Sequence, residues 1–395
     1  MPNFGDWMHT TFGPGWFAGI NAGDWLRLLV RERFSISPAY WPRAAFVSGL
    51  SVVTSAFQTV EDLMYKRRLR DISIQPPLFV LGHMRSGTTH LHNLLSLDHR
   101  FGHPTMFEVN FPQSYLLAER AFSWAMELTM PSSRPMDNMS VGADSPQEDE
   151  WAMVVMTQKS PYMGWSFPHS IRNYEKYWTL NDASPADREE WQESLLYFCR
   201  KLQWTHKRPL VLKSPAHTAR VRWLLPIFPQ ARFVHVHRNP YEVFRSTQRL
   251  WQKIRPFSQL QQPRDLHLDD ERIFACYREM HRQYFADRDS IPSGHLCEVR
   301  FEDLERRPLV TLQKIYEDLG LPDFSEVKPR FEEYLEQTAG YQKNKHKPLP
   351  ADQIRRINSE WRESFENWGY RMDEPVEAGH PAAAGLEAEG RPAAA

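Results

Sequence analysis

The sequence predicts an α/β fold in which helices cover both faces of a parallel sheet. Three observations predict it. Four short apolar segments follow one another from residue 78 onward, and each has the length of a buried strand. A segment with helical spacing of its apolar residues comes after each of them. Cationic residues stand at the ends of three of these strands, which is where ligands bind in such sheets.

Residues 1–75 are expected to form a helical N-terminal extension. Met1 is followed by Asp6 and an aromatic-rich stretch rather than by a basic segment and a cleavage site, which disfavours a secretory signal. Large apolar residues then recur three and four positions apart, as in one stripe of an amphipathic helix: Phe46, Leu50, Val53, Phe57, Val60 and Met64. The favoured interpretation is that this stripe packs on the domain core or on a partner subunit.

A membrane surface is the alternative partner of the N-terminal extension. Aromatic residues upstream of and at the start of the stripe favour that alternative: Trp7, Trp16, Phe17, Trp25 and Trp41. The extension ends in a basic patch, which we interpret as a solvated face: Lys66, Arg67, Arg68 and Arg70.

The main domain is predicted to span residues 76–372. Its strands are expected at 78–81, 210–212, 233–237 and 296–301, and its helices near 88–97, 216–226, 240–253 and 307–319. Between the first two strands lies a long insertion, residues 104–206, which we expect to be a helical substrate cap with loops at 131–146 and 160–168. Residues 373–395 are rich in Ala, Gly, Pro and Glu and are expected to be disordered.

The turn between the first strand and the first helix has the character of an anion cradle. Gly82 and Gly87 have the spacing of a P-loop, but Thr88 and Thr89 stand where a nucleotide-binding P-loop has Lys followed by Ser or Thr. The cation lies inside the loop instead, as Arg85. Such a loop directs backbone N–H groups and a helix N-terminus at one point. An ordinary strand-to-helix turn with incidental hydroxyl groups is the alternative.

Composition argues against several other classes. A net charge of -1 provides no electrostatic case for nucleic acid. Three widely spaced cysteines predict reduced thiols and a cytoplasmic setting: Cys199, Cys276 and Cys297. Neither a cysteine cluster nor an HExxH sequence is present, so no metal site is expected.

Other cations follow the later strands. Lys213 ends the second strand, and Arg238 ends the third, eight residues before Ser246 in the next helix. Because the carboxyl ends of parallel strands meet at one edge, we expect Arg85, Lys213 and Arg238 in one site. A cationic loop lies further downstream, with solvation as its alternative interpretation: Lys343, Lys345, His346 and Lys347.

Together these segments resemble the sulfotransferases that use 3'-phosphoadenosine 5'-phosphosulfate (PAPS). The sequence Arg85-Ser86-Gly87-Thr88-Thr89 resembles the family's 5'-phosphosulfate loop, in the broad bacterial and eukaryotic branch with an Arg-Ser-Gly-Thr-Thr sequence. Arg238 with Ser246 resembles its 3'-phosphate motif, and Lys213-Ser214-Pro215 its lysine-bearing strand end. The resemblance covers roughly residues 77–349. It implies a P-loop-like α/β fold and metal-independent sulfuryl transfer from PAPS, with the 3',5'-diphosphate PAP as product.

The resemblance also implies roles for individual residues. Arg85 and Lys213 would flank the sulfuryl group and the 5'-phosphate. Ser86, Gly87, Thr88 and Thr89 would form the cradle of the 5'-phosphate. Arg238 and Ser246, with Lys345 or Lys347, would hold the 3'-phosphate. Fixed cations and N–H groups stabilise the charge that grows on the leaving oxygen in such a displacement.

The general base is the part of the site that the resemblance does not fix. Pro215 occupies the position where the small-molecule branch has a catalytic His two residues after the strand-end Lys. Related branches use a Glu about twenty residues after the loop arginine, so Glu108, 23 residues after Arg85, is the first choice. Three alternatives stay open: Glu148, Asp149 and His217. The two carboxylates also suit a helix N-terminus for electrostatic reasons alone.

The acceptor is expected to be a hydroxyl compound, less so an amine. Aromatic residues in the insertion would suit a hydrophobic or lipid-like alcohol, or would simply belong to the core: Trp151, Tyr162, Trp165, Phe167, Tyr174, Tyr177 and Trp178. Peripheral contact with a membrane and a homo-oligomer both stay open. The competing functions are a P-loop nucleotide kinase or NTPase, disfavoured by the missing lysine, and an inactive module that binds PAPS or PAP.

Overall fold

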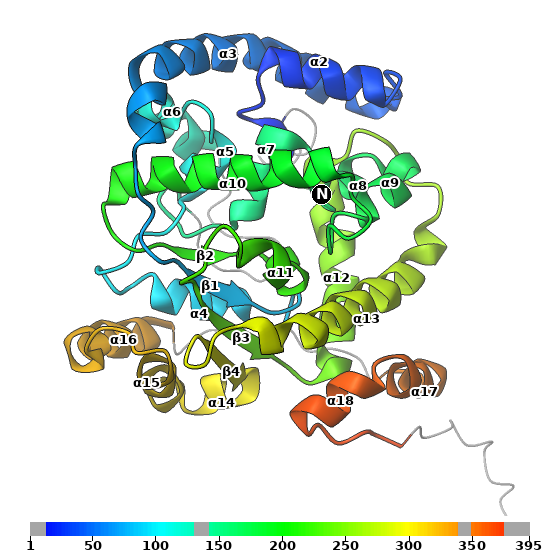
Figure 1. Cartoon of the computed structure of the whole chain (residues 1–395). Coiled ribbons are helices and arrows are strands. Elements are labelled where there is room, and N and C mark those ends of the chain that lie inside the picture. The colour runs from blue at the N-terminus through cyan, green and yellow to red at the C-terminus, as the bar shows by residue number, and fades with distance from the viewer. Residues whose placement is uncertain (1–12, 130–141, 339–348, 375–395) are drawn as a thin grey trace, which may run out of the picture.

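A four-stranded parallel sheet lies at the centre of the molecule. In the computed structural model, which describes residues 13–129, 142–338 and 349–374, its strands are β1 (Leu78–Leu81), β2 (Val211–Lys213), β3 (Arg232–His237) and β4 (Leu296–Arg300). They are ordered β2-β1-β3-β4 (Figure 1). Phe79 pairs with Leu212 on one side and with Phe233 on the other. The predicted α/β fold is confirmed, and each predicted strand lies within one residue of the observed bounds.

Both faces of the sheet are buried, as in a sheet enclosed by helices. On one face, Leu78 and Val80 pack in a core with α4 (Thr88–Leu95), α15 (Pro308–Asp318) and α16 (Phe324–Thr338). On the other, Phe79 and Leu81 join a larger core with α10 (Pro185–His206), α12 (Pro240–Ser258) and α13 (Asp269–Asp287). Alternate side chains of one strand therefore supply two cores.

The segment after β2 differs from the predicted single helix over 216–226. Pro215 opens a short 3-10 helix, η4 (Pro215–Ala219), and a separate turn, α11 (Val221–Leu224), follows. The Ser214 hydroxyl accepts a hydrogen bond from the Ala216 N–H at 3.2 Å, which fixes the tight entry. After β4 the chain turns directly into α14 (Phe301–Arg306), so the predicted strand is one residue too long.

The insertion at 104–206 is helical, as predicted. It contains α5 (Met106–Asn110), α6 (Tyr115–Thr129), α7 (Asp149–Thr157), α8 (Met163–Ser166), α9 (Ile171–Glu175) and α10. The loop expected at 160–168 includes α8, and most of the loop expected at 131–146 lies outside the described residues. The tail expected to be disordered over 373–395 also lies outside them, apart from residues 373 and 374. The remaining elements are η2 (Pro38–Tyr40), η3 (Pro168–Ser170), η5 (Leu266–Leu268), η6 (Arg288–Ser290), α17 (Ala351–Glu360) and α18 (Arg362–Trp368).

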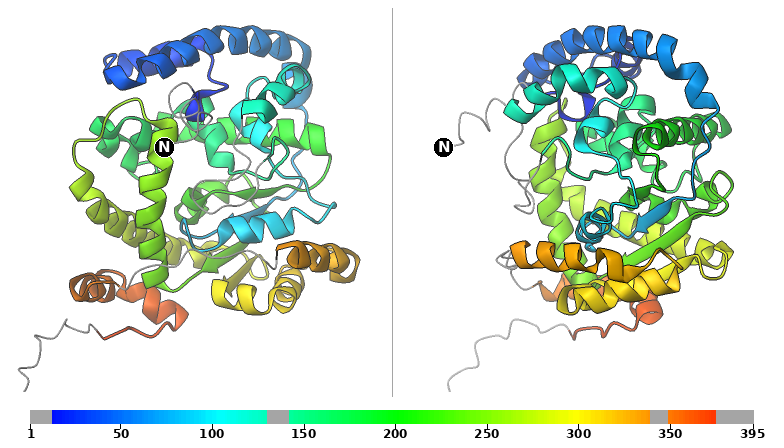
Figure 2. Two further views of the ribbon diagram at one scale, coloured as in Figure 1. Left: turned by 180° about the vertical axis from the view of Figure 1, so that it is seen from behind. Right: turned by 90° about the vertical axis from the view of Figure 1, so that its left-hand side faces the viewer.

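The N-terminal helices form a separate layer at one end of the molecule. After η1 (Gly15–Phe17), helices α2 (Ala22–Arg31) and α3 (Trp41–Arg70) lie at the end opposite α14 and α18 (Figures 1 and 2). The predicted helical extension is thus present. Nothing in the described ranges is a helix long and apolar enough to cross a membrane.

Most of the apolar stripe of α3 does not face the core. Phe46, Val53, Val60 and Met64 are exposed, so the expectation that they pack on the domain core is wrong, whereas Phe57 packs against Phe122. Packing of the stripe on a partner subunit, the other half of that expectation, stays a prediction. The side of α3 that is buried carries small and polar residues instead, among them Arg43, Val47, Ser51, Thr54 and Glu61. Hydrogen bonds and an ion pair inside the protein satisfy Arg43, Thr54 and Glu61, so the burial of these polar groups is tolerated.

Candidate functional site

The turn after β1 is a tight loop that needs glycine at two positions. Gly82 has φ 139°, and a Cβ there would lie 2.4 Å from the Val236 carbonyl oxygen. Gly87 has φ 102°, and a Cβ there would lie 2.1 Å from the ring of Phe301. Both positions therefore exclude larger residues. The Gly82 N–H donates to the Thr218 hydroxyl at 2.7 Å, which ties the loop to η4.

The loop residues are suited to an anion. α4 begins at Thr88, so its first N–H groups face the loop with the positive end of the helix dipole. The Ser86 hydroxyl is buried, yet it makes no hydrogen bond within the part of the chain that the structure describes. A buried hydroxyl without a partner is costly unless a ligand satisfies it. The cradle therefore fits a phosphate or phosphosulfate group.

Three of the predicted donor-binding residues come together beside this loop. Arg85 Nε donates to the Ser246 hydroxyl at 2.9 Å, and Arg238 Nη1 donates to the Arg85 carbonyl at 3.1 Å. The Arg238 guanidinium also lies over the Phe301 ring, 4.6 Å from its centroid. The two arginines thus come from neighbouring strand ends, β1 and β3, and reach one place with Ser246 of α12.

Lys213 connects the loop to a carboxylate of the insertion. Its side chain is buried at the end of β2, with Nζ 2.5 Å from Glu148 Oε1 and 3.5 Å from the Thr89 hydroxyl. Glu148 Oε2 accepts a second hydrogen bond from the Tyr162 hydroxyl at 2.7 Å. Burial, and then the charge of Glu148, raise the pKa of Tyr162 well above its ordinary value. The phenol therefore stays protonated and remains a donor.

Three successive acidic residues pair with three residues at and after the end of β2. Glu148 meets Lys213, Asp149 Oδ2 lies 2.5 Å from His217 Nε2, and Glu150 Oε2 lies 2.7 Å from Arg220 Nη1. Burial raises the pKa of Asp149, but His217 and Lys213 outweigh burial and hold the pKa below its ordinary value.

These pairs differ in their exposure. The side chains of Asp149, Glu150, His217 and Arg220 have no solvent exposure, whereas that of Glu148 is 13% exposed. The three pairs therefore hold the start of α7 against β2 and η4, and they leave Glu148 as the accessible carboxylate.

Glu108, the first choice for the base, has other partners. Its carboxylate accepts from the Thr105 N–H at 2.8 Å in a capping box at the start of α5. It also lies 3.2 Å from His206 Nε2, and the residue is 2% exposed. Glu148, not Glu108, is the carboxylate that pairs with Lys213. Lys345 and Lys347, predicted at the 3'-phosphate, lie outside the described residues.

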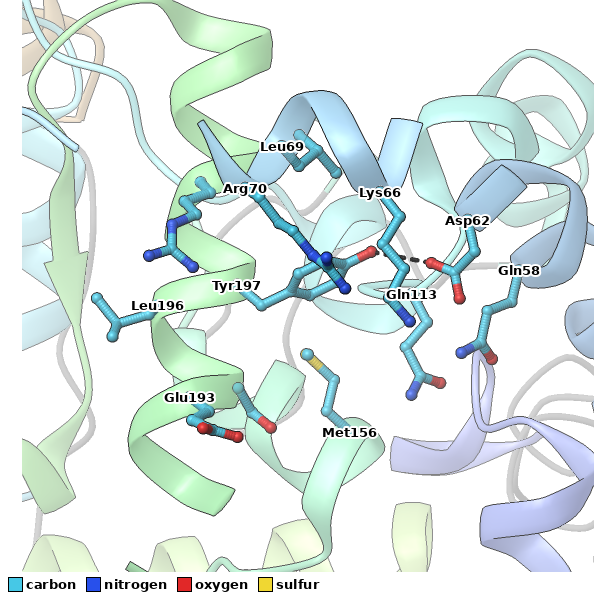
Figure 3. A pocket seen from close by; sticks show the side chains of 12 residues that line it. Gln58, Asp62, Lys66, Leu69, Arg70, Gln113, Met156, Glu193, Leu196 and Tyr197 are labelled. Carbon is cyan, nitrogen blue, oxygen red and sulfur yellow. Dashed lines mark hydrogen bonds between the residues drawn. The ribbon is translucent and has the colours of Figure 1, made fainter. Parts of the chain in front are cut away.

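A cavity of about 610 Å³ lies away from these residues, between α3, α7 and α10 (Figure 3). Lys66 and Arg70 reach into it from α3, opposite Glu193 and Tyr197 of α10, and Met156 of α7 closes one side. Among the predicted site residues that the structure describes, none lines it.

Sequence reasoning missed several supporting residues. Thr218, which binds the Gly82 N–H, follows Lys213 by five residues, and its place after a strand end was the available signal. Phe301, which packs on Gly87 and Arg238, had no sequence signal, because an aromatic at the end of a strand is ordinary. Tyr162 was predicted only as an aromatic of the cap.

Comparisons with known proteins identify the family of the chain. A sequence model described as the sulfotransferase family matches residues 76–326. The omega-hydroxy-beta-dihydromenaquinone-9 sulfotransferases Stf3 of Mycobacterium tuberculosis and Mycobacterium bovis are each 34% identical over 366 residues, 92% of this chain and 93% of the relative.

Solved structures show the same fold. Sulfotransferase STF9 from Mycobacterium avium aligns with a TM-score of 0.62 and 18% identity, over 90% of this chain and 98% of its own. Sulfotransferase STF1 from Mycobacterium tuberculosis aligns with a TM-score of 0.60 and 19% identity, over 79% of this chain and 86% of its own. The resemblance predicted from the loop and the strand ends is confirmed at the level of the family, and the kinase and inactive-module interpretations are set aside: the chain belongs to the sulfotransferase family and is a sulfotransferase enzyme.

Proposed function

We propose that the sulfuryl donor is PAPS and that the loop 82–89 binds its phosphosulfate end. Three features support this assignment: the start of α4, the guanidinium of Arg85, and the Ser86 hydroxyl, which has no hydrogen-bond partner among the described residues. Arg238 and Ser246 would take the 3'-phosphate, since an arginine beside a hydroxyl suits a phosphate dianion. The residues supply fixed positive charge, so the transfer needs no metal ion.

We assign the role of general base to Glu148, and the contact between Glu148 and Lys213 carries this proposal. A carboxylate and an ammonium group 2.5 Å apart, next to Thr89 of the loop, place a proton acceptor beside the cation that the leaving group needs. Glu148 removes the proton of the acceptor hydroxyl while the oxygen of that hydroxyl forms a bond to sulfur. The bond from sulfur to the bridging phosphate oxygen breaks, and Lys213 and Arg85 stabilise the charge left on that oxygen.

We further propose that the acceptor is the hydroxyl of a lipid-like alcohol. The related Stf3 sulfotransferase is named for its action on a hydroxylated menaquinone derivative. In this chain, Tyr162 belongs to an aromatic cluster next to Glu148: its ring lies 5.0 Å from Trp16, 4.8 Å from Trp165 and 6.1 Å from Trp178, between ring centroids. A buried aromatic cluster beside the base suits an apolar acceptor better than a sugar.

Transfer of label from [35S]PAPS tests the function directly. The full chain is incubated with labelled donor and either a long-chain prenyl alcohol, a short-chain alcohol or a sugar, in the presence of EDTA. We expect labelled sulfate ester with the alcohols and little with the sugar. Transfer that requires Mg²⁺, or label transfer only to the sugar, would contradict the proposal.

A further inference from the structure

Helices α2 and α3 and the segment joining them, residues 22–70, carry most of the exposed large apolar side chains of the described chain. We call this layer the crown. Ten of the twelve such side chains belong to it: Leu26, Val30, Phe34, Trp41, Phe46, Val52, Val53, Val60, Leu63 and Met64. The other two are Leu266 and Val310. A concentration of this kind on one layer marks an interaction surface.

The amphipathic character of α3 is inverted with respect to the core. Its buried side carries Arg43, Thr54 and Glu61, whose polar atoms bond the Gln259 carbonyl, the Ile20 carbonyl and the Lys201 ammonium. Its outer side is uncharged at every exposed position from Trp41 to Met64, a stretch of about 36 Å at 1.5 Å per residue. A solvated helix usually exposes its polar side.

The charges of the crown are sorted by sign. Its acidic residues are turned inward: Asp24, Glu32 and Glu61 are buried, and Asp62 is half-buried and accepts from Tyr197. Every exposed charged residue of the crown is cationic: Arg27, Arg31, Arg33, Lys66, Arg67, Arg68 and Arg70. Two of these, Lys66 and Arg70, reach into the cavity under α3. The whole chain has nearly equal numbers of acidic and basic residues, with a net charge of -1, so the excess of exposed cations on the crown is a local feature.

We propose that the crown docks on the surface of a lipid bilayer that contains anionic lipids. The uncharged outer side of α3 would enter the interface between headgroups and acyl chains, and the cations outside the cavity would contact phosphate and carboxylate headgroups: Arg27, Arg31, Arg33, Arg67 and Arg68. A water-soluble protein partner would explain the apolar side chains but not the absence of exposed carboxylates from the crown.

The crown also leads to the site, and in this respect the inference rests on the proposed function. η1 directly precedes α2, and its Trp16 stacks on Trp151 at 5.7 Å and contacts Tyr162, the residue that donates to Glu148. Trp16 and Tyr162 are buried, so packing connects the crown to the surroundings of the base, and under the proposed function an alcohol with a long apolar chain would approach the base from this side. Docking gives this enzyme access to an acceptor that stays in the bilayer.

Co-sedimentation of the full chain with vesicles tests the docking. We expect binding to vesicles of phosphatidylcholine with phosphatidylglycerol, weaker binding to phosphatidylcholine alone, and a decrease with salt. The double variant Val52→Asp/Leu63→Asp places charges at positions 64% and 84% exposed, so folding is expected to be unaffected. It should lose vesicle binding by about tenfold or more, whereas the control Val310→Asp, 62% exposed at the opposite end, should not.

Activity separates this proposal from the proposed function. Val52→Asp/Leu63→Asp should sulfate a water-soluble short-chain alcohol at the wild-type rate and lose turnover of a long-chain alcohol held in vesicles. A wild-type chain that transfers sulfate to the soluble alcohol but does not sediment with anionic vesicles would overturn docking alone. A concentration-dependent dimer in solution that this variant abolishes would likewise overturn it, because a second copy would then cover the crown.

Discussion

Lys213 is the residue at which the donor side and the acceptor side of the site meet. It ends β2, it reaches Thr89 of the loop, and it forms the closest contact of Glu148. A strand-end lysine can be predicted from the sequence, because an apolar run followed by a cation is visible there. Its partner cannot be predicted, because Glu148 lies 65 positions earlier in the sequence and meets Lys213 only through tertiary packing. For that reason the sequence alone left four candidates for the base: Glu108, Glu148, Asp149 and His217.

Replacement of Glu148 by Gln tests the base. The amide keeps the size of the side chain but cannot take a proton, so we expect kcat to fall about 10²- to 10⁴-fold. Affinity for PAP should stay within about threefold, since Glu148 does not belong to the donor cradle. Single-turnover rates and calorimetric binding of PAP measure the two quantities.

Glu108→Gln is the matched control for that variant. It changes a carboxylate that caps α5 and contacts His206, so we expect lower stability with little change in kcat. If Glu108→Gln lost kcat while Glu148→Gln kept it, the base would be Glu108, as first expected from the sequence.

Arg238→Ala tests the 3'-phosphate assignment. The loss of one charge-assisted contact should weaken PAP binding about 10- to 100-fold. Binding of adenosine 5'-phosphosulfate, which lacks the 3'-phosphate, should hardly change. Arg238 also donates to the Arg85 carbonyl, so an equal loss for both ligands would show that it orders the loop instead.

At the scale of elements, buried charge connects α3 to α10. Glu61 and Lys201 pair with no solvent exposure of either side chain, and Lys201 Nζ also donates to the Pro112 carbonyl at 2.6 Å. The Lys201 ammonium lies 4.4 Å from the Tyr115 ring centroid. This contact fixes one end of the crown on the catalytic domain. The sequence placed Glu61 in a helix with an apolar stripe, and nothing there indicated that the helix turns its polar side inward.

Lys201→Met measures the strength of this connection. It leaves Glu61 buried without its partner, so we expect the free energy of unfolding to fall by about 3–5 kcal/mol. Urea titration measures this loss. The double variant Glu61→Leu/Lys201→Met should recover most of it, because it buries no charge. Lys314→Met, which breaks an exposed pair with Asp318, should cost less than about 1 kcal/mol. A similarly small loss for Lys201→Met would show that the pair contributes no more than a surface one.

At the scale of the whole molecule, the sheet is the most predictable part. Its strands are short apolar runs buried on both faces, so their sequences alone identify them. The orientation of α3 was not predictable, because a stripe shows which residues lie together but not what lies against them. In this chain the apolar side of α3 faces outward and its polar side faces inward. The inward orientation depends on the contacts that α3 makes with α6 and α10, which the sequence of α3 does not contain.

A second whole-molecule feature is a cluster of four buried, neutral histidines at β3, α13 and the loop 82–89: His83, His235, His237 and His281. Burial lowers the pKa of His83 to about 4 and that of His237 to about 3, and it lowers the pKa values of His235 and His281 well below their ordinary range. His235 stacks on Tyr284 at 4.1 Å, and neither of its ring nitrogens makes a hydrogen bond in the described part of the chain. The folded state thus takes up fewer protons than the unfolded chain below pH 6.5.

Stability should therefore decrease as pH falls from about 6.5 toward 5, a window above that of the carboxylates. Each depressed histidine contributes up to about 1.4 kcal/mol per pH unit there, and nothing above pH 7, where both states are neutral. His235→Phe keeps an aromatic ring at the stack and removes one titrating group, so urea midpoints measured from pH 7.5 to 5 should decrease less steeply than in the wild type. Asn358→Ser, which changes a side chain bonded to Tyr241 and to the Asp373 carbonyl but removes no titrating group, serves as the control with the wild-type slope. Parallel slopes for His235→Phe and the wild type would mean that His235 is protonated in the folded state, and that burial does not keep it neutral.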